Sequence, residues 1–122
     1  MMNRTRKTLV ALLFAAAAAC NADGPPQVTR ATLDGTGMTP LAISAQAFAP
    51  IEFVNGDDVG HQIYSYDCAE LSTPFIEPGD TVTVYPGAGP KACHLEDLRA
   101  PDAIEFRGVV DVQPAYTQPS DG

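Results

Sequence analysis

Hydrophobic and polar positions alternate along this chain in short runs bounded by glycine, proline, asparagine and aspartate. Runs of about four to eight residues with β-branched or aromatic side chains at alternate positions are typical of half-buried β-strands. The pattern predicts seven or so short strands, within residues 27–33, 41–43, 51–54, 61–65, 71–76, 81–85, 91–94 and 105–112. Outside residues 8–19, no segment of ten or more residues has its apolar positions at helical spacing. Such strands, with ten glycines and eleven prolines among them, favour an antiparallel sandwich or barrel.

Residues 51–65 hold one of the two histidines of the chain, His61. An apolar run ends just before Asn-Gly at residues 55–56, which is a strong turn signal, and apolar positions resume at residue 63. His61 therefore lies where a loop becomes a strand. It is either a polar side chain at a loop edge or a metal ligand held by the start of a strand. A metal site needs partners, and the soft or imidazole side chains available are those of Cys68, Cys93 and His94.

The N-terminal part of the chain has the pattern of an export signal. Three basic residues lie within the first seven positions, and an apolar run at residues 8–19 ends in alanines directly before Cys20. The run is too short to span a membrane as a mature helix, so we expect residues 1–19 to be a signal peptide. The position of Cys20 resembles a bacterial lipoprotein processing site, where the cysteine is lipidated and becomes the mature N-terminus. Ordinary cleavage after the alanines is the alternative, and residues 20–26 are expected to form a tether.

The charge of the exported part bears on its location and partners. An aspartate directly after the lipidated cysteine would resemble an inner-membrane retention signal, and this chain has Asn21 at that position. We therefore expect a lipid-anchored protein of the periplasm or outer membrane. After signal removal four basic residues stand against 15 acidic ones, a formal charge of −11. Such a charge excludes binding to nucleic acid through phosphate contacts and favours a protein partner with a basic surface. Membrane attachment is expected through the N-terminal lipid.

The cysteines form an even pair once Cys20 is assigned to lipid. Cys68 and Cys93 remain, and in an oxidising compartment a disulfide is the expected state. Closing a loop of about 25 residues contributes about 3.5 kcal/mol to stability in the loop-entropy description. We therefore expect a disulfide between Cys68 and Cys93, and a free Cys93 thiolate is the alternative that a soft metal site would require.

Four stretches in this chain follow one another in a particular order. They are Phe53-Val54-Asn55 with Asp57 and His61 after it, a Pro-Gly turn and strand at residues 76–84, Cys93 at the end of the next strand, and Gly-Val-Val-Asp-Val at residues 108–112. Together they resemble the cupredoxins, the small β-sandwich family of blue-copper proteins, over residues 51–112. The resemblance implies an all-β, cupredoxin-like Greek-key β-sandwich of about seven strands at residues 27–113. Residues 114–122 after it are expected to form a disordered tail.

The resemblance also implies a copper site, and the expected ligands are incomplete. A blue-copper site has two histidines, a thiolate and a weak axial methionine. The candidate ligands here are His61, Cys93, His94 and Glu96, and no methionine follows Met38. Alternate residues of a strand point to opposite faces, so Cys93 and His94 face one metal only if their strand has already ended.

A variant cupredoxin-like group resembles the chain more closely around its cysteines. It has Asp-Cys soon after the first histidine, as at residues 67–68, and a segment Cys-Gly-Phe-His-Asp-His, which corresponds to residues 93–98. The paired histidines of that segment fall at Glu96 and Leu98, so one ligand becomes a carboxylate and the other is lost. In this alignment the two cysteines of the group are Cys68 and Cys93, again most simply a disulfide.

Three classes of function follow from these observations. The first is a metal-free interaction module that keeps the sandwich and has lost most copper ligands, and this is our prediction. The alternative is a copper-binding protein in electron transfer or copper handling, with copper as a possible cofactor. An enzyme is not expected, because a disulfide removes the thiolate that Cys-His catalysis needs and the acidic residues form no recognisable acid/base pair.

Overall fold

Nine β-strands and two short 3-10 segments follow one another through residues 28–115, the part of the chain that the computed structural model describes. The strands are β1 (Thr29–Asp34), β2 (Gly37–Thr39), β3 (Ala42–Gln46), β4 (Ile51–Asn55), β5 (Ile63–Tyr64), β6 (Thr81–Val84), β7 (Lys91–His94), β8 (Glu96–Asp97) and β9 (Val109–Gln113). The 3-10 segments are η3 (Ala69–Leu71), between β5 and β6, and η4 (Ile104–Phe106), between β8 and β9.

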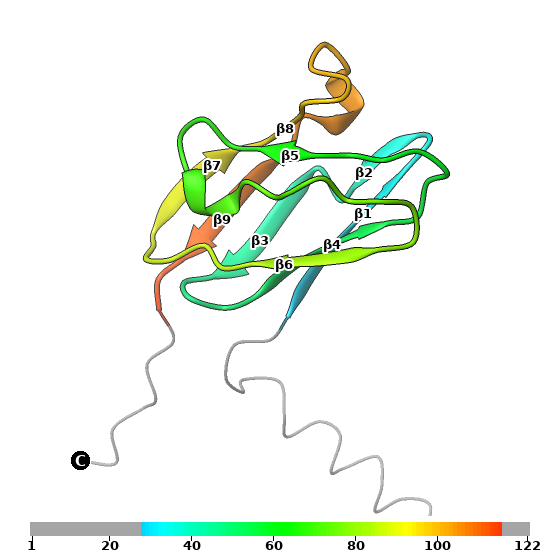
Figure 1. Ribbon diagram of the computed structural model, residues 1–122. Helices are drawn as coiled ribbons and strands as arrows, with labels where there is room; N and C mark the ends of the chain where they lie inside the picture. The colour runs from blue at the N-terminus through cyan, green and yellow to red at the C-terminus, as the bar shows by residue number, and fades with distance from the viewer. Residues whose placement is uncertain (1–27, 116–122) are drawn as a thin grey trace, which may run out of the picture.

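The strands form a sandwich (Figure 1). One sheet has the order β2-β1-β4-β6, the other has the order β3-β9-β7, and β5 pairs with β8 in a short two-stranded ribbon. The chain crosses to the second sheet between β2 and β4, so β4 returns beside β1 in parallel, and β9 closes the second sheet in parallel with β3. All other strand pairs are antiparallel.

Period-two alternation within each strand builds the core. In β4 the buried residues Ile51 and Phe53 alternate with the half-buried Glu52 and Val54, and β9 buries Val110 and Val112 in the same way. Successive side chains of a strand point to opposite faces, so the buried sets of the two sheets face each other. The core cluster consists largely of small and medium apolar side chains: Ala31, Leu33, Met38, Ile43, Ala45, Ala47, Ile51, Phe53, Ile63, Cys68, Leu71, Ile76, Val84, Cys93, Leu95, Phe106, Val110 and Val112.

The predicted all-β sandwich is confirmed, and several of its details are different. The strand expected at residues 71–76 is wrong: η3 ends at Leu71, and Ile76 makes only an isolated bridge to His61. Pro74 has no N–H to donate, and the Thr73 Oγ1 accepts from the Ile63 N–H in place of a backbone carbonyl. The purely antiparallel arrangement is also wrong because of the two parallel pairs.

Two short strands were not expected from the sequence. They are β2, which forms a hairpin with β1, and β8, which lies between the strands expected at residues 91–94 and 105–112. The closing strand was predicted at residues 105–112, but β9 begins at Val109 because η4 occupies Ile104–Phe106. The expected signal peptide at residues 1–19, Cys20 with its tether, and most of the tail at residues 114–122 lie outside the described residues.

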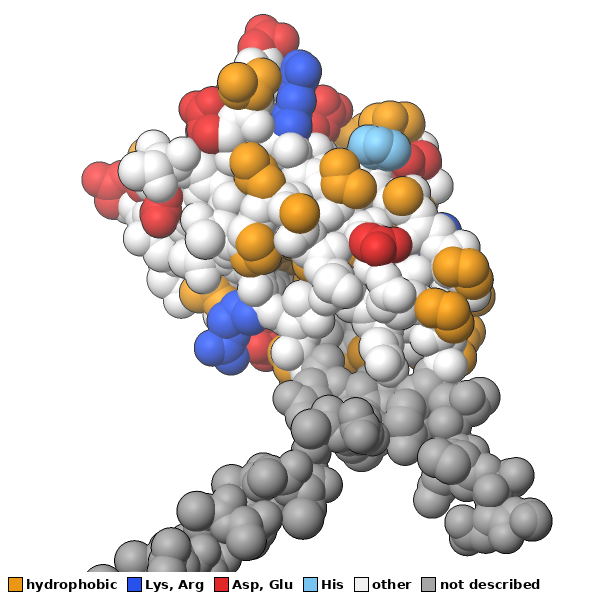
Figure 2. All heavy atoms as spheres, turned by 180° about the vertical axis from the view of Figure 1, so that it is seen from behind, with side chains coloured by type: hydrophobic (Ala, Val, Ile, Leu, Met, Phe, Trp, Pro, Cys, Tyr) orange, Lys and Arg blue, Asp and Glu red, His pale blue; other side chains and the backbone are white. Residues whose placement is uncertain are grey.

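The surface has two unlike ends. On the face that Figure 2 shows, most acidic side chains lie in the half of the molecule that carries η4, which we call the η4 end. At the opposite end β1 begins and β9 ends (Figure 1). Among the described residues no helix is long and apolar enough to cross a membrane.

Candidate functional site

His61 lies at the end of the loop between β4 and β5 and is almost fully buried, with 4 % of its surface exposed. Its backbone forms an isolated bridge with Ile76: the His61 N–H donates to the Ile76 carbonyl at 3.0 Å, and the Ile76 N–H donates back at 2.7 Å. The imidazole packs on the ring of Phe106 in η4, with ring centroids 4.9 Å apart. Backbone pairing and ring packing therefore fix this histidine as part of the core.

Both ring nitrogens of His61 contact carboxylates. Nδ1 is hydrogen-bonded to the Oδ2 of Asp97, and Nε2 lies 2.9 Å from the Oδ2 of Asp57. The side chain of Asp97 is fully buried, and that of Asp57 is 13 % exposed. We call His61, Asp57 and Asp97 the His61 cluster. A ring that faces an acceptor on each side is best satisfied as imidazolium, since only that form donates from both nitrogens.

The pKa values of the cluster follow from these contacts. Burial alone lowers the pKa of His61, but the hydrogen bonds to Asp97 and Asp57 and their negative charges outweigh it, so the pKa is raised. The hydrogen bond from His61 is the largest cause that lowers the pKa of Asp57, followed by the hydrogen bond from the Asp58 N–H. The arrangement therefore favours a protonated ring with ionised Asp57.

Asn55 shapes the loop that presents Asp57. The side chain of Asn55 is fully buried, and its amide nitrogen donates to the carbonyls of Val59 and Ile76, each at 2.9 Å. Its Oδ1 accepts from the Asp57 N–H at 2.9 Å. The turn signal at residues 55–56 thus leads to a loop held by one asparagine side chain, because each of its polar atoms has a partner.

Asp97 is held by β8 and the turn after it. Its Oδ1 accepts from the backbone N–H of Gln62 at 3.1 Å and from that of Arg99 at 3.0 Å, while its Oδ2 bonds to His61. These partners satisfy the carboxylate inside the protein, as a buried charge requires. The sequence interpretation named Glu96 and missed Asp97, the next residue, whose side chain contacts His61. The alternation of the buried Cys93 and Leu95 points to Asp97 as the next inward residue.

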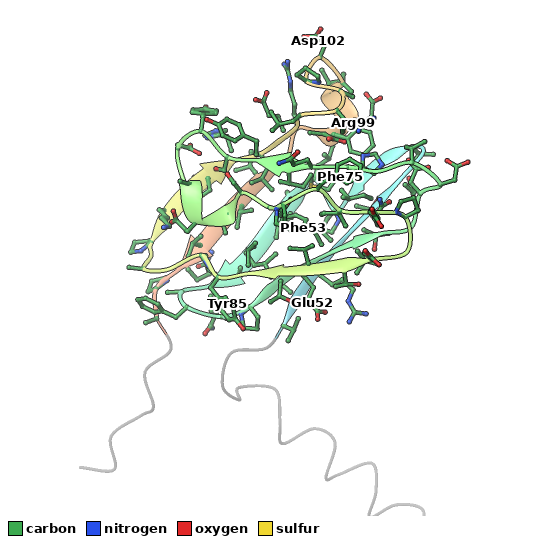
Figure 3. All side chains as sticks on the ribbon, in the orientation of Figure 1. Glu52, Phe53, Phe75, Tyr85, Arg99 and Asp102 are labelled. Atoms are coloured by element: carbon green, nitrogen blue, oxygen red, sulfur yellow. A yellow bond between two sulfur atoms is a disulfide. The ribbon has the colours of Figure 1, made fainter. Side chains whose placement is uncertain are left out.

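A hollow of about 330 Å³ borders the cluster at the η4 end. It is lined in part by His61, Asp57, Asp97, Arg99 and Phe106. Next to it the ring of Phe75 lies against Gly60, where a Cβ would come within 2.0 Å of the ring, so a larger residue at Gly60 would displace the ring. The guanidinium of Arg99 lies over that ring, 5.3 Å from its centre (Figure 3). This stack covers the loop that precedes His61.

Cys93 is joined to Cys68 by a disulfide, as predicted. Cys93 is fully buried and Cys68 is 5 % exposed. The sulfur of Cys93 is therefore bonded to another sulfur within the core and is not a thiolate. The alternative of a free Cys93 thiolate as a soft metal ligand does not agree with this geometry.

His94 follows Cys93 and points to the other face of β7, where its side chain is 51 % exposed. Its Nδ1 lies 2.7 Å from the Oδ2 of Asp67, and its ring stacks on Tyr66 with centroids 5.9 Å apart. The Oδ1 of Asp67 accepts from the His94 N–H and from the Ser65 hydroxyl. These hydrogen bonds, with that from the His94 ring as the largest cause, lower the pKa of Asp67 to about 2.

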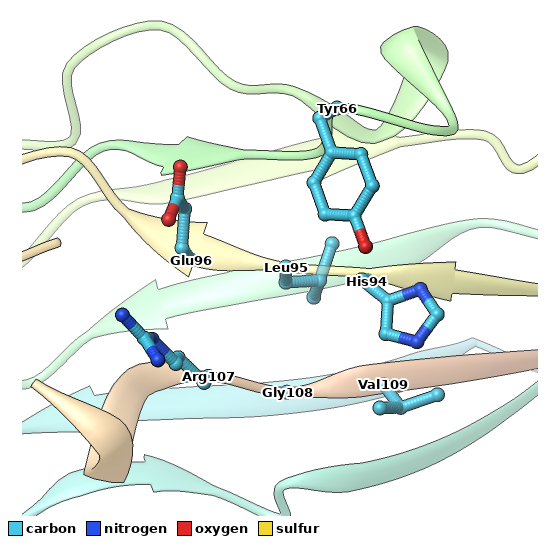
Figure 4. A pocket seen from close by; sticks show the side chains of 7 residues that line it. All are labelled: Tyr66, His94, Leu95, Glu96, Arg107, Gly108 and Val109. Carbon is cyan, nitrogen blue, oxygen red and sulfur yellow. The ribbon is translucent and has the colours of Figure 1, made fainter. Parts of the chain in front are cut away.

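A groove of about 280 Å³ runs beside His94 (Figure 4). Tyr66 and His94 lie on one side of it, Glu96 and Arg107 lie towards its other end, and Leu95, Gly108 and Val109 complete the lining. The guanidinium of Arg107 donates to the Pro101 carbonyl, at 2.9 Å from its NH2 nitrogen. The groove is thus a shallow, mixed polar surface next to the disulfide.

The four candidate metal ligands do not form one site. His94 and Glu96 line the groove, His61 lines the hollow at the η4 end, and Cys93 is in the disulfide. Within residues 28–115 no group of three or more histidine, cysteine, aspartate or glutamate side chains is arranged to hold a metal ion. A copper centre needs free imidazole nitrogens and, in its blue form, a thiolate. The residues present do not fit such a centre, because both nitrogens of His61 are already bonded.

Comparisons with known proteins place this geometry in a known fold. No protein-family model matches the sequence, and no curated protein matches it. Among solved structures, the chain is similar to a purple cupredoxin from Nitrosopumilus maritimus, with 19 % identity, a TM-score of 0.57, and coverage of 70 % of this chain and 99 % of that one. It is similar to auracyanin from Roseiflexus castenholzii, with 14 % identity, a TM-score of 0.59, and coverage of 75 % and 100 %.

A third similar structure is the Cu-containing nitrite reductase of Thermus scotoductus SA-01, with 17 % identity and a TM-score of 0.60. Here the match covers 77 % of this chain and 23 % of the reductase. At these identities the similarity concerns the fold, which is cupredoxin-like, as the four sequence stretches predicted.

Proposed function

We propose that this cupredoxin-like domain is an exported, lipid-anchored interaction module of the cell envelope that works without a metal. The observation that carries the proposal is the His61 cluster, in which carboxylates contact both ring nitrogens of the histidine that lies in the first cupredoxin-like stretch. The disulfide of Cys93 supports it, because a bridged sulfur does not bind copper as a thiolate.

The cluster joins segments that are far apart in the sequence. Asp57 belongs to the loop after β4, His61 pairs with Ile76, and Asp97 lies in β8, 36 residues after His61. One imidazolium between two carboxylates links these segments with charge-assisted hydrogen bonds, which are stronger than neutral ones. The cluster thus supplies the cross-link that bound metal ions provide in metal-dependent folds.

The η4 end supplies a surface for a protein partner. Four large apolar side chains are exposed in the segments around the hollow: Val59 at 53 %, Phe75 at 45 %, Leu98 at 45 % and Ile104 at 73 %. Asp58, Asp102 and Glu105 are exposed beside them in the same segments. Residues 28–115 contain 13 acidic and four basic residues, a formal charge of −9. The partner that fits is a protein surface with an apolar centre and a rim of lysine and arginine.

Copper titration of the full chain tests the proposal. With added copper(II) we expect no intense visible absorption, because the band that a thiolate ligand gives requires a free Cys93. Weak binding that persists in His61→Ala and disappears in His94→Ala would place the ion on an exposed imidazole and leave the proposal standing. An intense blue or green band that is lost in Cys93→Ser would overturn it.

The second candidate is a copper-binding protein in electron transfer or copper handling. The similarity to a Cu-containing nitrite reductase supports it. The copper titration separates the two, because an electron carrier must bind copper in the core next to His61, and copper there must compete with Asp57 and Asp97 for the ring nitrogens. If the protein is a copper carrier of this kind, removing either carboxylate, as in Asp57→Asn, should increase its copper uptake.

A further inference from the structure

The end of the sandwich where β1 begins and β9 ends has no charged residue in the segments that build it. These are residues 28–29, 46–51, 84–90 and 112–115, and we call them together the apolar end (Figure 1). Elsewhere residues 28–115 carry 17 charged side chains. A chain this acidic that leaves one whole end uncharged has an unusual surface there, because charged residues normally cover exposed loops.

The four segments form one continuous surface. The Thr29 N–H donates to the Pro50 carbonyl at 3.1 Å, the Ala47 N–H to the Gln113 carbonyl at 3.1 Å, and the Phe48 N–H to the Gly87 carbonyl at 2.8 Å. At Gly89 a Cβ would lie 2.4 Å from the carbonyl oxygen of Gln113, so the loop after β6 packs directly on the end of β9. These contacts hold the turns of the apolar end in one rigid unit.

Three large apolar side chains project from this unit into solvent. Phe48 is 62 % exposed, Tyr85 is 58 % exposed and Val28 is 53 % exposed. Figure 3 shows Tyr85 at the end of the molecule where β1 begins. Nothing in the packing of the core requires these side chains to be large, because most of their surface faces outward.

The backbone of Phe48 is strained. Its φ is +63°, and it is the one residue other than glycine with a positive φ in the described part of the chain. A bulky residue in the left-handed region is less favourable than glycine, because its Cβ comes too close to the following carbonyl oxygen. The chain thus keeps an exposed aromatic ring at a position that glycine would occupy without strain, which indicates that the ring has a role outside the fold.

The length of the N-terminal segment indicates what lies against the apolar end. Seven residues separate Cys20 from Val28, so covalent geometry limits the distance between their Cα atoms to about 28 Å. A lipid on Cys20 would therefore keep Val28 close to the bilayer. The acidic η4 end is repelled by anionic lipids, whereas the two ion pairs at the rim of the apolar end, Arg30–Glu52 and Lys91–Glu70, are neutral as pairs.

We propose that the apolar end rests on the membrane that holds the N-terminal anchor, with Phe48 and Tyr85 in the lipid interface. Aromatic side chains prefer this zone, where their apolar ring contacts acyl chains and a polar tip reaches water. The proposal rests on the lipid anchor of the proposed function and adds an orientation to it. The η4 end, with its exposed apolar and acidic side chains, then points away from the membrane towards a partner.

Single tryptophans test this orientation, because the chain has no tryptophan of its own. Phe48→Trp and Tyr85→Trp report on the apolar end, and Ile104→Trp in η4 is the matched control at a comparably exposed position of the opposite end. Each full-length variant is reconstituted in phosphatidylcholine vesicles with and without brominated acyl chains, which quench tryptophan on contact. We expect at least twofold quenching at positions 48 and 85 and no quenching at position 104.

The outcomes separate the anchor from the surface. If the protein floats with the vesicles and none of the three tryptophans is quenched, the anchor stands and the orientation is overturned. Equal quenching at all three positions also overturns it. If the protein does not float, the anchor proposal fails, and the same variants are mixed with free vesicles. Quenching at positions 48 and 85 alone then still supports contact between the apolar end and the membrane. The absence of quenching at these positions overturns that contact.

Phe48→Gly in the Tyr85→Trp background tests the meaning of the strain. Glycine adopts a positive φ freely, so the midpoint of thermal unfolding should rise by several degrees while quenching at position 85 decreases. A gain in stability together with a loss of membrane contact is expected if the strained backbone of Phe48 serves membrane binding and not folding. A lower midpoint with unchanged quenching would assign Phe48 to the fold and overturn its role at the membrane.

Discussion

His61 and His94 each contact an aspartate through Nδ1, yet the two pairs have very different surroundings. The side chain of His61 is 5 % exposed and its second nitrogen meets another carboxylate, whereas that of His94 is 51 % exposed and stacks on Tyr66. A buried ion pair is costly to break, because the remaining charge stays without water or partner, and an exposed pair is screened by solvent. The same pair of residue types is therefore a core cross-link at one place and a surface contact at the other.

Replacing each histidine by alanine is the most direct test of the difference between the buried and the exposed pair. His61→Ala leaves Asp97 buried without its imidazole, so we expect a loss of about 3–5 kcal/mol in the free energy of unfolding. His94→Ala, the matched control, should cost less than about 1 kcal/mol. Urea unfolding followed by circular dichroism measures both. Equal losses would mean that burial does not distinguish the two pairs.

The disulfide is expected to have an effect of similar size, and it lies beside the exposed pair. Cys68 follows Asp67 and Cys93 precedes His94, so the bond fixes the two segments that bring this pair together. The double variant Cys68→Ala/Cys93→Ala should lose about 3.5 kcal/mol, the loop-entropy contribution. Reductant should destabilise the parent chain and leave the double variant unchanged. Recovery of both cysteines as free thiols by non-reducing peptide mapping would contradict the bond itself.

The pH dependence of stability should show the smallest change, with a different sign for each kind of group. The pKa of His61 is raised in the folded state, so its contribution is complete below about pH 6.5, the unfolded value, and is lost as the pH rises through the raised pKa. The pKa values of Asp57 and Asp67 are lowered, so their contributions are present above about pH 3.9 and are lost as the pH falls through the lowered values.

Stability should therefore be greatest between about pH 4 and pH 6.5. His61→Ala should flatten the decline on the alkaline side, and His94→Ala should leave that decline in place. Urea midpoints measured across the pH range test both statements. An alkaline decline that is unchanged in His61→Ala would assign it to another group.

The sequence was sufficient to predict the sandwich, the disulfide and the position of His61 between a loop and a strand. Local patterns carry these features: alternation for the strands, an even pair of cysteines for the bond, and an Asn-Gly turn before the histidine. The partners of His61 were harder to predict, because Asp97 is 36 residues away and reaches the ring only through the pairing of β5 with β8. A two-residue strand leaves almost no periodic signal.

Other features could not be predicted because they depend on tertiary contacts. The segment after η3 has the composition of a strand, but Thr73 bonds to Ile63 through its N–H and its side-chain oxygen, and Pro74 has no N–H. The positive φ of Phe48 also has no local signal, since glycine or asparagine normally marks such positions. Both are cases in which neighbouring segments override the preference of the residue.

The His61 cluster has one more consequence, for how the protein matures. Its central cation is a proton on a side chain of the chain itself, held between Asp57 and Asp97. On the proposed function, the cross-link therefore forms as the chain itself folds, and completing the domain requires no metallochaperone or metal supply. On the same proposal, a domain of this kind is complete once it has folded, whether its surroundings are rich or poor in copper.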